Sequence, residues 1–334
     1  MKRLRLPRCL GTAPALAGVL VCALLTACAT PQVTQLRQAQ TQQLGQSPNQ
    51  TPGQPALPDR ADLPSVPFFA QKEYECGPAA LAMLLSAAGL QTSPDDLVEQ
   101  VYLPARQGSL QVEMLAAARQ RGLVAYPLRP ALHDVLQEVA AGHPVLVFQN
   151  LSLPIYPVWH YAVVVAYDLE RNRITLHSGE TARLEMSLFT FERTWARGGY
   201  WAMLALPPDQ FPASADAATF GRSVALLEER QPQQARVAFE TALRRWPDDS
   251  KLWFGLGNSA YALHQLEQAA QAYQAAVAAQ PDFADAWNNL AQTRLDQGDP
   301  RAAQQAIGQA VASGGVRLAR YLLLQEQITA ALLK

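Results

Sequence analysis

The sequence predicts two folded parts: an α+β domain in which helices precede an antiparallel sheet, and then an all-α solenoid. Two observations carry this prediction. In residues 61–207, apolar segments of helical length come first and short β-rich runs bounded by turn residues follow them. Residues 208–334 lack strand signals and repeat with a period of 34 residues. A length of 334 residues is sufficient for a separate core in each part.

The first 28 residues have the order of a secretory signal. Basic side chains at the start precede an apolar stretch over 10–25, and the motif LTAC over 25–28 ends it. This ending resembles the bacterial lipobox. The resemblance implies cleavage before Cys28, a diacylglyceryl group on its thiol and, because Ala29 rather than Asp follows, an outer-membrane location facing the periplasm. We therefore expect residues 1–27 to be a lipoprotein signal peptide; the alternative is an ordinary signal with a chance cysteine.

Residues 28–60 have the composition of a linker. They contain nine Gln, many Pro, Thr and Ser, and no aromatic residue. Such a composition cannot bury a core, so we expect a disordered Gln/Pro-rich tether. The whole chain has a net charge of −1 and only 16% charged residues, which argues against a basic nucleic-acid-binding protein.

The number and positions of the cysteines limit the roles that Cys76 can have. Of the four cysteines, two lie in the expected signal peptide and Cys28 is the expected lipidation site, which leaves Cys76 as the only free thiol. It has no disulfide partner, and no cysteine cluster indicates a metal site or another cofactor. Cys76 is therefore either an inert buried residue or a working nucleophile.

The expected elements of residues 61–207 follow from capping residues and apolar patterns. Gly-Pro and Ser-Pro-Asp-Asp sequences mark two helix starts, and glycines mark helix ends. The expected helices span 77–89, 93–101, 109–122 and 132–141, and the expected strands span 144–150, 161–168, 173–179 and 199–206.

Several positions repeat together in residues 208–334. Trp253 recurs as Trp287, and small residues and aromatics recur at fixed positions between them. This pattern resembles the tetratricopeptide repeat, in which small residues let paired helices approach closely. We expect residues 316–333 to form a capping helix. The resemblance implies a protein partner, bound as an extended peptide or a helix in the concave groove of the repeats.

Cys76 lies at the start of the helix that Gly77-Pro78 opens. A thiol reacts as its thiolate, and unpaired N–H groups at a helix start favour negative charge. We therefore expect the helix start to lower the pKa of Cys76 and its N–H groups to face an oxyanion. Gln71 can donate its amide to the same oxygen. Among five histidines, His160 stands at a loop–strand junction and is the candidate base.

These residues resemble the bacteriocin-processing cysteine peptidases (peptidase family 39), which have a papain-like fold. The segments VPFFAQKEYECGPAALAMLLSAAG and HYAVVVAYD carry the resemblance, which spans about 65–207. It implies Gln71 as oxyanion donor, Cys76 as nucleophile and His160 as base. Where the family has an Asp that orients the histidine, this chain has Ser178, which can hydrogen-bond an imidazole but cannot stabilise imidazolium by charge. Glu180 is a nearby carboxylate that could substitute for it.

Three interpretations of function remain open. The first is a lipid-anchored, periplasm-facing cysteine peptidase that acts by Cys–His acyl transfer on a peptide or protein recruited by the repeats. The second is a repeat-based binding or assembly lipoprotein whose peptidase-like domain is degenerate, and Ser178 motivates it. The third is transfer by the same Cys–His pair, such as transpeptidation. No cofactor is expected in any of them.

Overall fold

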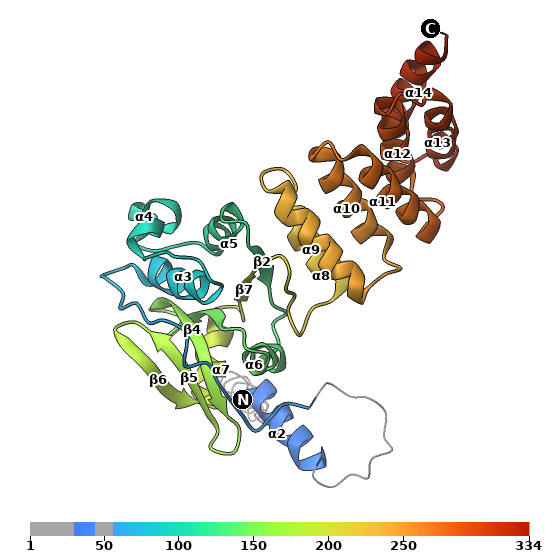
Figure 1. Ribbon diagram of the computed structural model, residues 1–334. Helices are drawn as coiled ribbons and strands as arrows, with labels where there is room; N and C mark the ends of the chain where they lie inside the picture. The colour runs from blue at the N-terminus through green and yellow to red at the C-terminus, as the bar shows by residue number, and fades with distance from the viewer. Residues whose placement is uncertain (1–29, 44–55, 334) are drawn as a thin grey trace, which may run out of the picture.

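The computed structural model describes residues 30–43 and 56–333 of the chain (Figure 1). A layered α+β domain is followed by a row of helices that projects away from it and ends at the C-terminus. The expected signal peptide, Cys28 and residues 44–55 lie outside the described residues. No helix within the described ranges is both long enough and apolar enough to cross a bilayer.

The centre of the first part is one antiparallel sheet. Its strands follow the order β2-β7-β3-β4-β5-β6, and β1 pairs with β4 beside this path. β4 is the longest strand and is buried from His160 to Tyr167. The strands are β1 Arg60–Asp62, β2 Val124–Pro127, β3 Val145–Asn150, β4 Trp159–Asp168, β5 Arg173–Ser178, β6 Thr181–Ser187 and β7 Ala202–Leu206.

Helices cover both faces of the sheet (Figure 1). Alternate residues of β4 divide between two cores: Val163 packs in the core that includes α3, and Val164 packs in the core that includes α6 and α7. This is the alternation that a strand buried on both faces requires. The helices of this part are α3 Cys76–Ala87, α4 Asp95–Val101, α5 Gln111–Gln120, α6 Leu132–Ala140 and α7 Leu188–Arg197, with a short 3₁₀ turn at Pro104–Arg106.

The predicted α+β order is confirmed, and the expected helices and strands are present with small shifts at their ends. Sequence analysis missed β1, β2, β6 and α7. In β6 the signal was present, because Ala182, Leu184 and Met186 alternate with polar residues, although most of the strand is exposed. In α7 the signal was present, because Leu188, Phe191 and Trp195 follow helical spacing and all three are buried.

The expectation of a disordered tether over 28–60 is wrong for part of that range. Residues Pro31–Gln43 form a helix, α2, that packs against α6 and α7. Val33 is fully buried, and Leu36 packs against the same core. The buried carboxylate of Glu192 accepts hydrogen bonds from the backbone N–H groups of Gln32 (2.9 Å) and Val33 (2.7 Å). An acidic group at a helix start satisfies unpaired N–H groups and complements the helix dipole, which explains why this polar segment is helical.

The second part consists of paired helices, as the period of 34 residues predicted. Gly255 and Gly257 let these helices approach closely: a Cβ on Gly257 would lie 2.5 Å from the Tyr273 ring. The predicted capping helix is α14. The helices are α8 Ala217–Ala225, α9 Pro232–Arg245, α10 Ser250–Ala262, α11 Leu266–Ala279, α12 Ala284–Asp296, α13 Pro300–Ser313 and α14 Leu318–Leu332.

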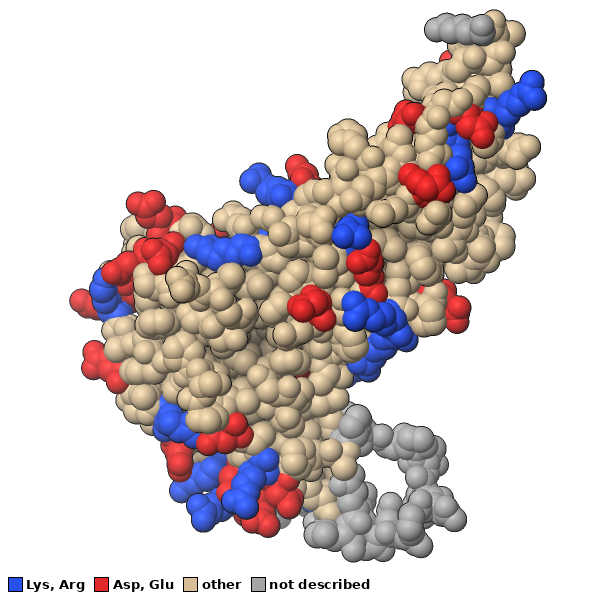
Figure 2. Space-filling model, viewed as in Figure 1, with Lys and Arg blue, Asp and Glu red and all other residues tan. Residues whose placement is uncertain are grey.

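The surface carries few charges. Figure 2 shows acidic and basic side chains interspersed on the visible face, with broad uncharged areas between them. This distribution fits the net charge of −1 and differs from the clustered basic surface that nucleic-acid binding requires.

Candidate active site

Cys76 is the first residue of α3 and the single cysteine of the described part of the chain. It is half-buried, and the helix behind it is buried from Gly77 to Leu85. Tyr74, two residues earlier, has a φ of 63°, a left-handed conformation that residues other than glycine rarely adopt. The tight turn before α3 therefore places the thiol at the helix start, where the first N–H groups have no partner within the helix.

His160 is the second residue of β4 and is buried. Its Nε2 lies 2.9 Å from the hydroxyl oxygen of Ser178 at the end of β5. The antiparallel pairing of these two strands sets this contact, because Ser178 lies opposite Ala162, two residues from His160 along β4. When Nε2 carries the proton and donates it to Ser178, Nδ1 is left as the basic nitrogen of the ring.

Gln71 completes the predicted group. Its backbone N–H donates to the carbonyl of Gly179 (3.2 Å), which ties the segment before α3 to the β5–β6 turn. Gln71, Cys76 and His160 all line one cleft of about 790 Å³. The structure therefore brings together three side chains that are separated by up to 89 positions in the sequence. The remaining lining residues are Lys72, Glu73, Tyr74, Arg106, Gln107, Gly108, Ser109, Leu110, Gln111, Phe148, Val158, Trp159, Tyr161 and Glu180.

Burial controls the charge state of the Cys–His pair. It raises the pKa of Cys76, although backbone hydrogen bonds from Tyr161, Gly77 and Cys76 itself act in the opposite direction. It also lowers the pKa of His160 to about 4. The backbone N–H groups at the helix start act in the expected direction, but the expectation of a lowered pKa for Cys76 is wrong, because desolvation outweighs them. Near neutral pH the site holds a thiol and a neutral imidazole.

Two further groups near the site have other roles. His177 is buried, and its ring nitrogens contact the carbonyl of Val66 (3.1 Å) and the N–H of Arg183 (3.2 Å), so it supports the backbone. Glu180 lines the cleft but is exposed, and the hydrogen bond of the His160 ring goes to Ser178 instead. In the described ranges no group of three His, Cys, Asp or Glu side chains is arranged to hold a metal ion.

Sequence analysis missed one wall of the cleft. Phe148 on β3 stacks on Trp159, with ring centroids 5.2 Å apart and planes 12° apart, and Tyr161 lies 4.7 Å from Phe148. The Tyr161 hydroxyl donates to the carbonyl of Ser109 (3.2 Å), which ties the opposite rim to β4. The aromatic residues on either side of His160 were the available signal, since a strand places alternate side chains on the same face.

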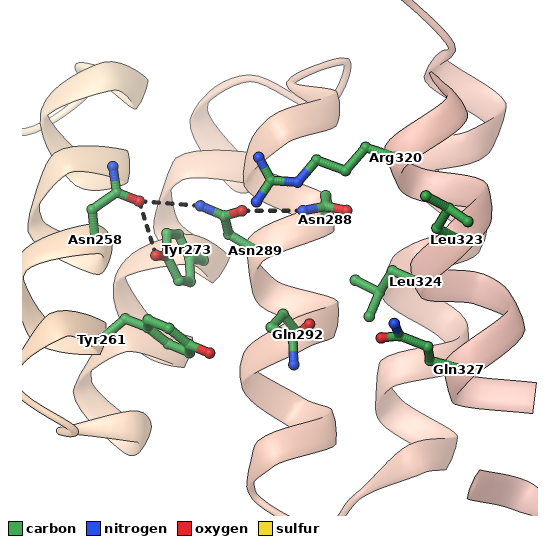
Figure 3. Close-up of a pocket in the computed structure, with 10 residues that line it drawn as sticks. All are labelled: Asn258, Tyr261, Tyr273, Asn288, Asn289, Gln292, Arg320, Leu323, Leu324 and Gln327. Atoms are coloured by element: carbon green, nitrogen blue, oxygen red, sulfur yellow. Dashed lines mark hydrogen bonds between the residues drawn. The ribbon is translucent and has the colours of Figure 1, made fainter. Parts of the chain in front are cut away.

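A second hollow lies between helices of the repeats. It has a volume of about 560 Å³, and Figure 3 shows its side chains facing one another from α10, α11, α12 and α14. The Asn258 carbonyl accepts from Tyr273 (2.9 Å) and from Asn289 (3.1 Å), and Asn289 in turn accepts from Asn288 (3.1 Å). The third amide oxygen of this hydrogen-bonded series, Oδ1 of Asn288, is buried without a partner. Arg320 adds a positive charge on the α14 side.

Comparisons with family models divide the chain as the fold does. Residues 64–203 match the model of the Peptidase_C39-like family. Residues 220–282 and 272–305 match two tetratricopeptide repeat models. A search of the curated proteins gave no match.

Solved structures of both kinds are similar to parts of the chain. A C39-like peptidase from Bacillus anthracis is 17% identical with a TM-score of 0.38, over 45% of this chain and 98% of that chain. The TPR2B domain of yeast Sti1, in its complex with pHsp70, is 15% identical with a TM-score of 0.32, over 34% and 94%. The Yersinia enterocolitica type III secretion chaperone SycD, with a YopD peptide, is 18% identical with a TM-score of 0.33, over 35% and 95%. From the family models and the fold, the chain carries a Peptidase_C39-like domain followed by tetratricopeptide repeats.

Proposed function

We propose that this protein is a cysteine peptidase that acts by Cys–His acyl transfer on a peptide or protein substrate. One observation carries the proposal: the single free thiol among the described residues, Cys76, stands at a helix start in the same cleft as the buried His160, whose Nε2 has a hydrogen-bond partner. A nucleophile, a base and a group that orients the base form the arrangement that nucleophilic catalysis needs.

The neutral pair dictates the order of proton transfers. His160 Nδ1 takes the thiol proton as Cys76 Sγ attacks the substrate carbonyl, and the backbone N–H of Cys76 and the Gln71 amide hold the oxyanion. The C–N bond then breaks, and the imidazolium returns its proton to the leaving amine. Water attacks the thioester with His160 again as base, which releases the acid and restores the Cys76 thiol.

Ser178 has the role of a positioning residue. Its hydroxyl holds the ring orientation of His160, and it accepts the Nε2 proton in the tautomer that leaves Nδ1 basic, but it adds no negative charge to stabilise the imidazolium. In a Ser-type triad the loss of that charge costs up to about 10⁴ in rate. We therefore expect slow turnover, suited to a substrate that is held in place for a long time.

The repeats can hold such a substrate in place. Their hollow presents a row of amide groups and one arginine, which can hydrogen-bond the backbone or a polar side chain of a protein partner. The LTAC motif at 25–28 supports a lipid anchor on Cys28 at the periplasmic face of the outer membrane. Metabolic labelling with an alkyne fatty acid, compared between the full chain and Cys28→Ala, tests the anchor.

A peptide-library experiment tests the activity. The chain from Ala29 onward, as the unmodified protein and as Cys76→Ala, is incubated with proteome-derived peptides, and new N-termini are identified by mass spectrometry. Peptidase activity predicts a set of cleavages that is absent with Cys76→Ala and with His160→Ala. Cleavages that persist in both variants would reject Cys76 and His160 as the catalytic pair.

One observation favours a second candidate, a degenerate domain in a repeat-based binding protein. Ser178 replaces the expected carboxylate, and burial disfavours the thiolate of Cys76. This candidate predicts no cleavage by the unmodified protein, and partner capture that is the same with Cys76→Ala.

A further inference from the structure

The loop between β3 and β4 exposes an unusual amount of apolar surface. Ile155 is 76% exposed and Tyr156 is 75% exposed. Within residues 151–159, whose sequence LSLPIYPVW has no charged residue, six side chains are large, apolar and exposed. They are Leu151, Leu153, Ile155, Tyr156, Val158 and Trp159. A contiguous exposed apolar patch usually marks an interaction site. We call residues 151–159, which comprise the β3–β4 loop and the first residue of β4, the apolar loop.

Internal hydrogen bonds hold the apolar loop in this outward conformation. The buried Asn150 side chain accepts from the N–H groups of Ser152 and Val158, both at 3.0 Å. The Leu151 N–H donates to the Val158 carbonyl (2.9 Å), which closes the loop at its base. Two prolines in the loop restrict its backbone further. The exposed side chains are therefore preorganised, which reduces the entropy lost when a ligand covers them.

The apolar loop is continuous with the catalytic cleft. Val158 and Trp159 belong to both, and the Trp159 ring stacks on Phe148 inside the cleft. His160 follows Trp159 directly in the sequence. An apolar surface thus runs from the tip of the loop to the candidate base.

The segments that line the cleft before α3 and at the start of α5 form a largely polar rim. They contribute Gln71, Lys72, Glu73, Gln107 and Gln111, together with Tyr74 and Leu110. A cleft with one apolar wall and one largely polar rim suits an extended peptide, which has apolar side chains and a polar backbone. A peptide that occupies the cleft beside His160 would lie against Val158 and Trp159 of the apolar loop, and this shared lining favours a peptide as the occupant.

We propose that the apolar loop binds an apolar segment of the substrate peptide next to the cleaved bond. This inference rests on the proposed peptidase function, since it names the substrate class of the same site. The substrate is then a peptide or unfolded segment with large aliphatic or aromatic residues beside the scissile bond. Its apolar side chains cover the loop while its backbone contacts the polar rim.

Peptide binding tests the proposal without turnover. The chain from Ala29 onward, which contains every described residue, carries Cys76→Ala, and two fluorescein-labelled 12-residue peptides are titrated by fluorescence anisotropy. One peptide has Leu at alternate positions and the other has Asn in place of each Leu. We expect the Leu peptide to bind at least tenfold more tightly. The triple variant Ile155→Ser, Tyr156→Ser, Val158→Ser should remove this preference.

A matched control and a second site exclude trivial explanations. Leu226→Ser changes an apolar side chain that is 63% exposed at the C-cap of α8 and lies outside the cleft, and it should leave both affinities unchanged. The variant Asn258→Ala, Asn289→Ala reports binding in the repeat hollow. Circular dichroism and urea unfolding of the triple variant establish that it folds.

Three results would overturn the proposal. One is equal affinity of the two peptides for the parent protein, and another is a preference that survives in the triple variant but is lost in the Asn258, Asn289 variant. The third is a triple variant that binds both peptides with unchanged affinity but no longer binds phosphatidylethanolamine–phosphatidylglycerol vesicles, or no longer forms a dimer that the parent protein forms in sedimentation experiments. A protein that binds the Leu peptide through the loop but cleaves nothing with Cys76 present would contradict only the peptidase function.

Discussion

Acid should destabilise the peptidase-like domain through one buried histidine. Burial lowers the pKa of His160 to about 4, whereas an exposed histidine titrates near 6.5. Below pH 6.5 the unfolded chain binds a proton at this position and the folded chain does not. The unfolded state therefore binds more protons, so the stability that His160 contributes is complete above pH 6.5 and is lost as the pH falls towards 4.

The size of the effect follows from the two pKa values. Each pKa unit is worth about 1.4 kcal/mol, so the difference between about 4 and 6.5 corresponds to about 3 kcal/mol in total. At pH 4.5 the folded state still binds little proton, and the loss at that pH is about 2.5 kcal/mol relative to pH 8. Burial also lowers the pKa of His177, which adds to the loss in the same direction.

Comparison with His160→Gln isolates the contribution of His160. Cys76 gives a probe that is specific to this domain, because it is the single cysteine of the chain from Ala29 onward. Pulse labelling with 2,2′-dithiodipyridine, a reagent that reacts with thiols in acid, reports the unfolded fraction in urea at pH values from 8 to 4.5. The glutamine side chain does not titrate, so the variant should lose about 2.5 kcal/mol less than the parent over this range.

A difference in the free energy of unfolding between the two proteins that stays constant with pH would refute this account. If His160→Gln lowers the free energy of unfolding by the same amount at every pH, the imidazole is neutral or charged equally in both states, and burial does not control its protonation. A uniform destabilisation by the substitution does not affect the test, because only the change with pH is compared.

Three further substitutions test other parts of the structure. In Ser178→Asp a carboxylate replaces the hydroxyl that contacts His160 Nε2 and should raise the pKa of His160. Because imidazolium stabilises the Cys76 thiolate, iodoacetamide alkylation at pH 6 should become at least about tenfold faster. An unchanged rate would contradict the assigned contact. Gly257→Ala places a Cβ 2.5 Å from the Tyr273 ring and should lower the free energy of unfolding of the repeats in urea by about 1–3 kcal/mol. The control Gly308→Ala, where a Cβ meets nothing within 4 Å, should not destabilise them. Equal effects of the two substitutions would contradict the packing argument. Glu192→Ala removes the acceptor for two α2 N–H groups and should raise hydrogen exchange in α2 at least tenfold, and unaltered exchange would show that α2 does not depend on it.

The candidate site was predictable from sequence where its residues lie in short motifs. Gln71 and Cys76 flank one helix start, and His160 begins a strongly apolar strand, so local patterns and a family resemblance located all three. Ser178 was located by its position after the next strand, and the structure places its hydroxyl 2.9 Å from the imidazole. Their catalytic roles remain predictions that the experiments above address.

Properties that depend on distant contacts were not predictable. Burial of Cys76 and His160 decides their charge state, and burial is set by strands and helices from the whole domain. The first N–H groups of α2 are bound by Glu192, which lies 160 positions away from Gln32. Local composition correctly indicated that the segment has little apolar surface, but it gave no sign of a partner that satisfies its N–H groups.

The packing between the two parts bears on how the cleft and the repeat hollow work together. Phe220 of α8 and Phe239 of α9 are buried in the same hydrophobic core as Tyr126 of β2, so the first repeat helices share a core with the sheet. A shared core resists independent movement, unlike the polar contacts between domains joined by a flexible linker. A partner held in the hollow would therefore be presented to the cleft in one preferred orientation, which favours cleavage at a defined distance from the bound segment. The peptide-library experiment can register this as cleavage sites that keep a constant spacing from the segment that binds the repeats.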